Sequence, residues 1–216
     1  MVCPSQAGMK TSPSHARPLK ILAVSDFIDK SLKLQVEKKT LEPVDLIVSC
    51  GDLPPEYLSF LRDRLDRPLL YVKGNHDIRY SSYNPMGCEN IHANIVRFNS
   101  INIMGLEGSM WYNGGVNQYT DKEMKKIISG MWFSFWRKKR VDLVITHAPP
   151  RKVNDAEDRC HMGFESFISL IEKRAPSFFI HGHIHKDFDT LDDRITVVKT
   201  TKVVNTCGYT ILEVQP

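Results

Sequence analysis

Short apolar runs that end in polar residues recur through the first third of the chain. Residues 21–24, 46–49 and 69–72 have this pattern, which is typical of buried strands. Residues 31–41 and 55–65 lie between these runs and have helical spacing. The order strand, helix, strand, helix, strand predicts a βαβαβ unit with parallel strands.

The rest of the chain continues with shorter elements. Thr120 and Glu123 form a capping box that predicts a helix through about residue 128, and residues 163–174 predict another helix. The remaining apolar runs predict strands: a hairpin of 95–98 and 101–105, single strands at 143–146 and 178–180, and a terminal meander of 195–198, 202–204 and 209–214. We find no internal repeat and no interior linker, so the sequence predicts a single α/β domain over residues 19–216.

The composition is that of an ordinary soluble protein, with 42% of the 216 residues hydrophobic and 25% charged. No apolar run approaches the roughly 20 residues that span a bilayer, so we expect no transmembrane segment. Residues 1–18 are rich in Ser, Pro and Ala and lack the apolar core of a signal peptide, so we expect a disordered leader. The net charge of +4 is too weak to indicate a nucleic-acid partner.

The five cysteines are widely scattered and form no Cys-x-x-Cys pair. The sequence therefore indicates neither a disulfide framework nor a zinc ribbon. A reducing cytoplasm is the simplest location for such a chain.

Potential metal ligands follow most of the predicted strands. They are Asp26, Asp52, Asn75, His76, Asp77, His147, His183 and His185. His183 and His185 alternate in an extended run and can therefore project the same way. In open α/β sheets ligands gather at the carboxyl ends of the strands, and Asp, Asn and His together suit first-row divalent ions. A carboxylate such as Asp52 can bridge two ions, so the sequence predicts a metal centre.

The order of these motifs resembles the calcineurin-like metallophosphoesterases. The resemblance covers residues 19–214 and rests on Asp26, Gly51-Asp52, Gly74-Asn75-His76-Asp77, Thr146-His147 and Gly182-His183-Ile184-His185. It implies an α/β fold of the αββα sandwich type, with two mixed β-sheets flanked by helices. Within the family, the last two motifs and Asn205 are most similar to the class III cyclic-nucleotide phosphodiesterase relatives.

The resemblance also implies a role for each site residue. Asp26 and His185 would bind a first metal ion, Asn75, His147 and His183 would bind a second, and Asp52 would bridge them. The two divalent ions would be Mn, Fe, Zn or Ni. His76 would be the general acid, and Asp77 would orient a neighbouring side chain.

One position departs from the family pattern. The family motif opens with Asp-x-His, whereas this chain has Ile28 two residues after Asp26. Isoleucine cannot bind a metal, so Asp29 or water takes the place of the missing ligand, or the first site binds weakly, or it stays empty. The inference to the fold does not depend on this position.

The implied activity is hydrolysis of a small phosphorylated substrate. The resemblance favours phosphodiesters, attacked by a metal-activated hydroxide while His76 protonates the departing oxygen. Arg79, Arg159 and His161 are candidate contacts for the phosphate because guanidinium and imidazole groups suit an oxyanion, although Arg159 and His161 fit a solvated loop equally well. The alternative is a protein-binding scaffold, because the family includes a phosphoesterase-like retromer subunit that has lost catalytic groups. Ile28 would fit such a loss, while the retained histidines argue against it.

Residues 131–136 combine a methionine with four aromatic residues and are followed by the basic run 137–140. We expect these aromatic side chains to cover the core and the charges to be a solvated helix end. Alternatively, this segment could bind a membrane surface or form the contact between two copies of the chain in a homodimer.

Overall fold

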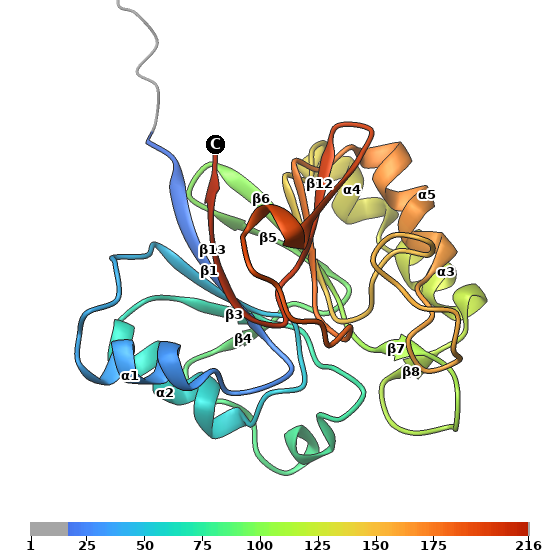
Figure 1. Cartoon of the computed structure of the whole chain (residues 1–216). Helices are drawn as coiled ribbons and strands as arrows, with labels where there is room; N and C mark the ends of the chain where they lie inside the picture. The colour runs from blue at the N-terminus through green and yellow to red at the C-terminus, as the bar shows by residue number, and fades with distance from the viewer. Residues whose placement is uncertain (1–16, 216) are drawn as a thin grey trace, which may run out of the picture.

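The computed structural model describes residues 17–215, so most of the predicted leader lies outside the described residues. Two β-sheets pack face to face, and helices cover the outer face of each (Figure 1). One apolar cluster fills the space between the sheets, and two others lie under the two helical layers. The predicted αββα sandwich with two mixed sheets is confirmed.

The first sheet contains most of the N-terminal βαβαβ unit. Its order is β13 (Gly208–Val214), β1 (Leu19–Ser25), β2 (Leu46–Ser49), β3 (Leu69–Tyr71) and β4 (Glu89–Asn90). Strands β1 to β4 are parallel, and β13 runs antiparallel to β1. Helices α1 (Lys30–Glu37) and α2 (Pro55–Leu65) cover its outer face. Every residue of β2 is buried, as expected for a parallel strand with both faces covered.

The second sheet contains the rest of the long strands. Its order is β11 (Ile195–Val198), β12 (Thr201–Asn205), β10 (Phe178–His181), β9 (Leu143–Thr146), β6 (Ile101–Leu106) and β5 (Asn94–Phe98). The four central strands are parallel, and β11 and β5 are antiparallel edges. The outer helices are α3 (Asp121–Gly130), α4 (Trp132–Lys138) and α5 (Glu165–Arg174).

The smaller elements lie in the connections. Strands β7 (Ser109–Met110) and β8 (Gln118–Tyr119) form a two-stranded sheet. Two 3-10 helices, η1 (Ile78–Ser81) and η2 (Asp192–Arg194), follow the loops after β3 and β10.

Most predicted elements form close to their expected bounds. The Thr120–Glu123 capping box begins α3, and the predicted hairpin is β5–β6. The terminal meander is wrong, because β11 and β12 pair in the second sheet whereas β13 crosses to the first sheet and pairs with β1. Apolar runs of four to seven residues do not specify which sheet a strand joins.

The expected covering of the core by the aromatic segment is also mostly wrong. Phe135 is buried, but Trp132, Phe133 and Trp136 are exposed on α4. Among residues 17–215, no helix is long and apolar enough to cross a membrane.

Candidate metal centre

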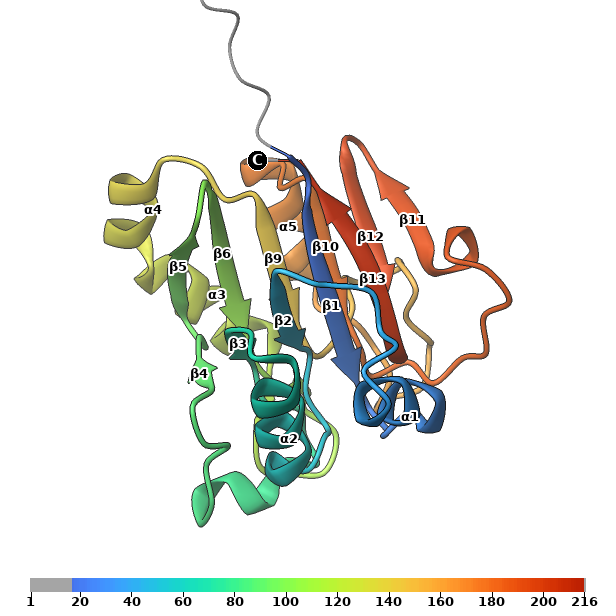
Figure 2. The same ribbon diagram turned by 90° about the vertical axis from the view of Figure 1, so that its left-hand side faces the viewer.

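The strands of both sheets deliver the ligand-type residues to one edge of the sandwich. Asp26 follows β1, Asp52 follows β2, and His147 follows β9. Strands β1, β2 and β6 point toward this edge (Figure 2), and β9 is parallel to β6. A hydrogen bond from the His183 amide to Asp26 Oδ1 at 2.8 Å joins a loop of the second sheet to one of the first. The predicted gathering of ligands at the carboxyl ends of the strands is therefore present.

The loops at this edge approach one another very closely. A Cβ atom added to Gly74 would lie 2.0 Å from Asp52 Oδ1, and one added to Gly51 would lie 2.4 Å from the Gly74 nitrogen. Asp26, Asp52 and His183 have φ values of 69°, 58° and 69°, in the left-handed region that non-glycine residues rarely adopt. Backbone strain of this kind clusters at functional sites, where the surrounding structure maintains it.

His147 is fully buried and contacts three oxygen atoms. Its Nδ1 atom donates a hydrogen bond to the Cys50 carbonyl at 2.8 Å. Its Nε2 atom lies 3.0 Å from Asn75 Oδ1 and 3.2 Å from Asp52 Oδ2. A neutral imidazole with its proton on Nδ1 would leave three acceptor atoms facing one another. Either a second proton on the ring or a cation must lie between them.

The pKa values of His147 and Asp52 are shifted in opposite directions. Burial lowers the pKa of His147, but the Asp52 carboxylate outweighs burial and raises it to about 9. Burial raises the pKa of Asp52, but His147 outweighs burial and lowers it to about 2. The metal-free pair is therefore an imidazolium and a carboxylate. Replacing the Nε2 proton by a divalent ion would satisfy the same acceptors, so these residues fit a metal.

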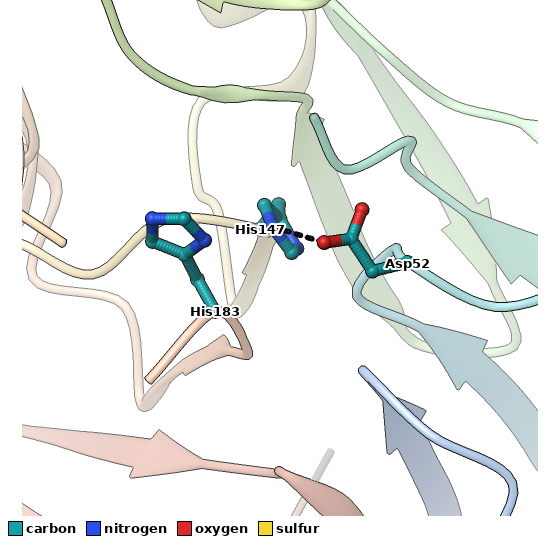
Figure 3. A group of neighbouring side chains, drawn as sticks. All are labelled: Asp52, His147 and His183. Atoms are coloured by element: carbon teal, nitrogen blue, oxygen red, sulfur yellow. Dashed lines mark ion pairs between the residues drawn. The ribbon is translucent and has the colours of Figure 1, made fainter. Parts of the chain in front are cut away.

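His183 completes a group of three ligand-type side chains with Asp52 and His147 (Figure 3). One ligand atom from each of the three lies within 4.8 Å of the others. The Nε2 atom of His183 donates to the Cys160 carbonyl at 2.5 Å, which leaves Nδ1 without a proton. Burial lowers the pKa of His183 to about 3, so the ring is neutral. A neutral imidazole whose other nitrogen donates to a backbone carbonyl is the usual state of a histidine ligand.

Two residues near the centre were not identified from the sequence. The Tyr112 hydroxyl accepts a hydrogen bond from Asn75 Nδ2 at 3.1 Å, so Asn75 presents its Oδ1 atom to His147. Asn117 Nδ2 donates to the Gly74 carbonyl at 2.8 Å. Both belong to the segment between β6 and α3. The glycines of this segment predict a loop, but nothing in its sequence indicates that these two residues approach the metal centre.

Asp77 joins the loops after β2 and β3. Its Oδ2 atom accepts from the Asp52 amide at 2.9 Å and the Gly74 amide at 2.7 Å. Burial, together with the charge of Asp52, raises the pKa of Asp77 to about 7 despite these hydrogen bonds. His76 is exposed, and its amide donates to Asp52 Oδ1 at 2.9 Å.

The group around Asp26 is more open. His185 Nε2 lies 3.7 Å from Asp26 Oδ1, and its side chain is 66% exposed. Asp29 is the N-cap of α1, and its Oδ1 atom accepts from the Leu32 amide at 2.9 Å. Ile28 is 37% exposed beside it. The structure thus assigns Asp29 a helix-capping contact, while its second carboxylate oxygen is free of this bond.

The three candidate phosphate contacts do not come together. Arg79 forms an ion pair with Glu56, and Arg159 is exposed. The His161 ring lies 5.3 Å from the His183 ring, while its Nδ1 atom is 2.9 Å from Asp158 Oδ1. Asp158, Cys160 and His161 form a second group of ligand-type side chains beside the centre.

The sequence model of the calcineurin-like phosphoesterases matches residues 19–187. The chain belongs to this family. Family members are generally metal-dependent phosphoester hydrolases, and Asp52, His147 and His183 form a candidate metal site in this chain. The family resemblance inferred from the sequence motifs is therefore confirmed.

Solved structures with the same fold are distant in sequence. The protein TT1561 of Thermus thermophilus is 15% identical with a TM-score of 0.63, and the match covers 91% of this chain and 94% of that chain. Vacuolar Protein Sorting 29 from Cryptosporidium parvum is 11% identical with a TM-score of 0.50, and the match covers 93% of this chain and 87% of that one. A putative 5'-nucleotidase from Staphylococcus aureus is 12% identical with a TM-score of 0.52, and the match covers 92% of this chain and 53% of that one. No curated protein sequence matches the chain. These similarities show the fold alone.

Proposed function

We propose that this protein is a metal-dependent phosphoesterase that hydrolyses small phosphodiesters. The observation that carries the proposal is the contact of His147 Nε2 with both Asp52 Oδ2 and Asn75 Oδ1. Three acceptors that face one another inside a protein need either a proton or a metal cation between them. Because members of this family generally depend on metal ions, we take a divalent metal ion to occupy this position in the active protein.

The residues divide into two groups of ligands. Asn75, His147 and His183 would hold the second ion, Asp26 and His185 would hold the first, and Asp52 would contribute to both. The hydrogen bonds to the Cys50 and Cys160 carbonyls orient the two buried imidazoles before any ion binds. Bound divalent ions supply a hydroxide nucleophile near neutral pH and offset the charge of the phosphate.

Proton transfer to the leaving group is assigned to His76. Its amide donates a hydrogen bond to Asp52 Oδ1, and the residue is exposed to solvent. An imidazole N–H in this position protonates the departing ester oxygen. Asp77 supports this geometry because it holds the Asp52 and Gly74 amides on one carboxylate oxygen.

The rim of the centre favours an ester with an organic group. Phe27 and Ile28 follow Asp26 directly and are 49% and 37% exposed. Such a rim suits a phosphodiester with apolar atoms on at least one side. Arg159 and His161 lie on the loop before α5 and are the proposed contacts for its free oxygens; Arg79 would first have to leave Glu56.

The first ion is proposed to bind more weakly than the second. Ile28 supplies no ligand, and the Asp29 carboxylate caps α1. Water then takes the place of the missing histidine. The proposed location is the cytoplasm, in accord with the free state of the four described cysteines.

Hydrolysis of bis-p-nitrophenyl phosphate by the purified protein tests the proposal. We expect turnover with added Mn²⁺ that is abolished by EDTA and by His147→Asn. His92→Asn is the control, because His92 is a partly buried histidine that contacts Glu107 outside the centre. Absence of turnover with Mn²⁺, Fe²⁺, Zn²⁺ and Ni²⁺ would refute the enzymatic function.

Ile28 favours one alternative, a protein-binding scaffold that has lost part of the centre. Metal content separates the two functions. If the protein is a scaffold, we expect the purified protein to carry no Mn, Fe or Zn after gentle isolation and to bind none of these ions on titration. The phosphoesterase predicts at least one tightly bound ion per chain.

A further inference from the structure

Helix α4 carries three aromatic side chains on its exposed side. Trp132, Phe133 and Trp136 are 68%, 52% and 70% exposed. We call these three residues the aromatic patch. The Phe133 ring centroid lies 5.8 Å from those of both Trp132 and Trp136, so the rings form one continuous group. Large aromatic side chains are normally buried for most of their area, so an exposed group of three marks a candidate interaction surface.

The other side of α4 is already packed. Met131 and Phe135 are buried in the cluster beneath the outer helices. The Arg174 guanidinium covers the Phe135 ring at 3.9 Å from its centroid. Positions 132, 133 and 136 fall within an arc of about 100° on a helix, and Phe135 lies about 60° outside this arc. The aromatic patch is therefore not needed to attach α4 to the protein.

A basic run, residues 137–140, follows the patch directly. Arg140 forms an ion pair with the buried Asp142. Among residues 17–215, no carboxylate forms an ion pair with Arg137, Lys138 or Lys139. Lys125 and Lys173 add positive charge in the groove beside Trp132, and Asp121 and Glu165 line the same groove. The segment from Met131 to Arg140 contains no acidic residue.

The patch lies at the far end of the sandwich from the metal centre. The basic run immediately precedes β9, and His147 follows the other end of β9. Figure 2 shows α4 at the end opposite the arrowheads of β1 and β2. A surface that covers the patch would leave the centre open to solvent.

We propose that the aromatic patch and the basic run dock this protein on an anionic lipid bilayer. Trp and Phe rings favour the boundary between head groups and acyl chains, while Lys and Arg next to them attract anionic head groups. The aromatic patch and the basic run are consecutive on one short segment, and Arg137 lies about 40° from Phe133 around the helix. This inference is independent of the proposed catalytic function.

A second copy of the chain fits the same face less well. A two-fold dimer would bring the patch of one copy against the patch of the other. The unpaired Arg137, Lys138 and Lys139 of both copies would then lie close together, and like charges across an interface are unfavourable. An anionic membrane complements both the aromatic patch and the charge.

Sedimentation of the full chain with lipid vesicles tests the proposal. We expect binding to vesicles of phosphatidylcholine mixed with phosphatidylserine and binding weaker by about a hundredfold to phosphatidylcholine alone, because each cation near an anionic surface contributes about fivefold. Replacing Arg137, Lys138 and Lys139 by Gln should reduce binding to the mixed vesicles to the phosphatidylcholine level. A Lys33, Lys38 and Lys39→Gln variant on and after α1 removes the same charge and should bind normally.

The aromatic contribution is tested separately. Trp136→Ser should weaken binding to the mixed vesicles by about tenfold, whereas Trp111→Ser, at another exposed tryptophan, should not. Bis-p-nitrophenyl phosphate hydrolysis and circular dichroism should be unchanged in the patch variants, which shows that they fold. Lack of sedimentation with the mixed vesicles overturns the proposal. So does a dimer in analytical ultracentrifugation that Trp136→Ser disrupts, or binding to a soluble acidic peptide that matches the vesicle binding.

Discussion

His147 Nε2 lies 3.2 Å from Asp52 Oδ2, and both side chains are almost completely buried. The Nδ1 atom of this histidine is already committed to a backbone carbonyl. The proton on Nε2 is therefore the group that a metal ion must displace. This competition between a proton and a metal leads to a prediction about pH.

Metal affinity should rise with pH across the neutral range. The pKa of His147 is raised to about 9 in the metal-free protein, so below that pH each ion must displace one proton from it. We expect an increase of about tenfold per pH unit from this group alone. Calorimetry in buffers of different ionisation enthalpy should show about one proton released from His147 per ion at neutral pH. Affinity that does not change between pH 6 and pH 8 would contradict this charge assignment.

The same pair determines how the metal-free protein responds to alkali. The folded pKa of His147 lies above the ordinary value of 6.5. Its contribution to the free energy of unfolding is therefore complete below pH 6.5 and is lost as the pH rises through about 9. Urea unfolding in EDTA at several pH values measures the decline, which Asp52→Asn should greatly reduce.

Gly74→Ala should disrupt the centre and destabilise the protein. The new Cβ atom would lie 2.0 Å from Asp52 Oδ1. Asp52 is held in place because its amide donates to Asp77 Oδ2 and its Oδ1 atom accepts from the His76 amide. We expect loss of at least about 2 kcal/mol of unfolding free energy, because a crowded buried site must shift, together with weaker metal binding. Gly130→Ala is the matched control, since its Cβ would meet no atom within 4 Å and should not destabilise the protein. Equal stability of both variants would show that the loops can separate at little cost.

Tyr112→Phe should weaken binding of the second ion. The substitution removes the hydroxyl that holds Asn75 Nδ2, so Asn75 can rotate and withdraw Oδ1 from His147. Losing a group that orients a ligand typically reduces metal affinity by about tenfold. Tyr119→Phe is the control, because the Tyr119 hydroxyl belongs to the same segment but donates to Glu107 rather than contacting Asn75. This substitution should leave the metal affinity unchanged. Titration of the metal-free proteins with Mn²⁺ compares the two variants.

The sequence predicts the parts of this structure that depend on local pattern. Short apolar runs followed by Asp or His locate β1, β2 and β9 and the residues at their ends, because a parallel buried strand is apolar throughout. The Tyr112–Asn75 contact could not be predicted, since its partners are 37 positions apart and no motif joins them. The exposure of Trp136 was also missed, because helical spacing indicates an apolar face but not what covers it.

Ile28→His should restore the ligand that the family pattern contains and raise occupancy of the first ion. Asp26 and His185 are already present, and His185 Nε2 is within 3.7 Å of Asp26 Oδ1. We expect the first ion to bind at least about tenfold more tightly and metal content to approach two ions per chain. Phe27→His places the same side chain at the neighbouring exposed position and should have no such effect.

Asp29→Ser completes this comparison, because serine retains the helix cap of α1 but removes the carboxylate. If water occupies the missing position, Asp29→Ser leaves the metal content and the hydrolysis rate unchanged, and Ile28→His raises both. If Asp29 itself binds the first ion, Asp29→Ser lowers occupancy and Ile28→His adds little. Metal analysis after dialysis at a fixed free Mn²⁺ concentration separates these outcomes. We expect the first pattern, because the Asp29 Oδ1 atom is held by the Leu32 amide and the Ser31 hydroxyl.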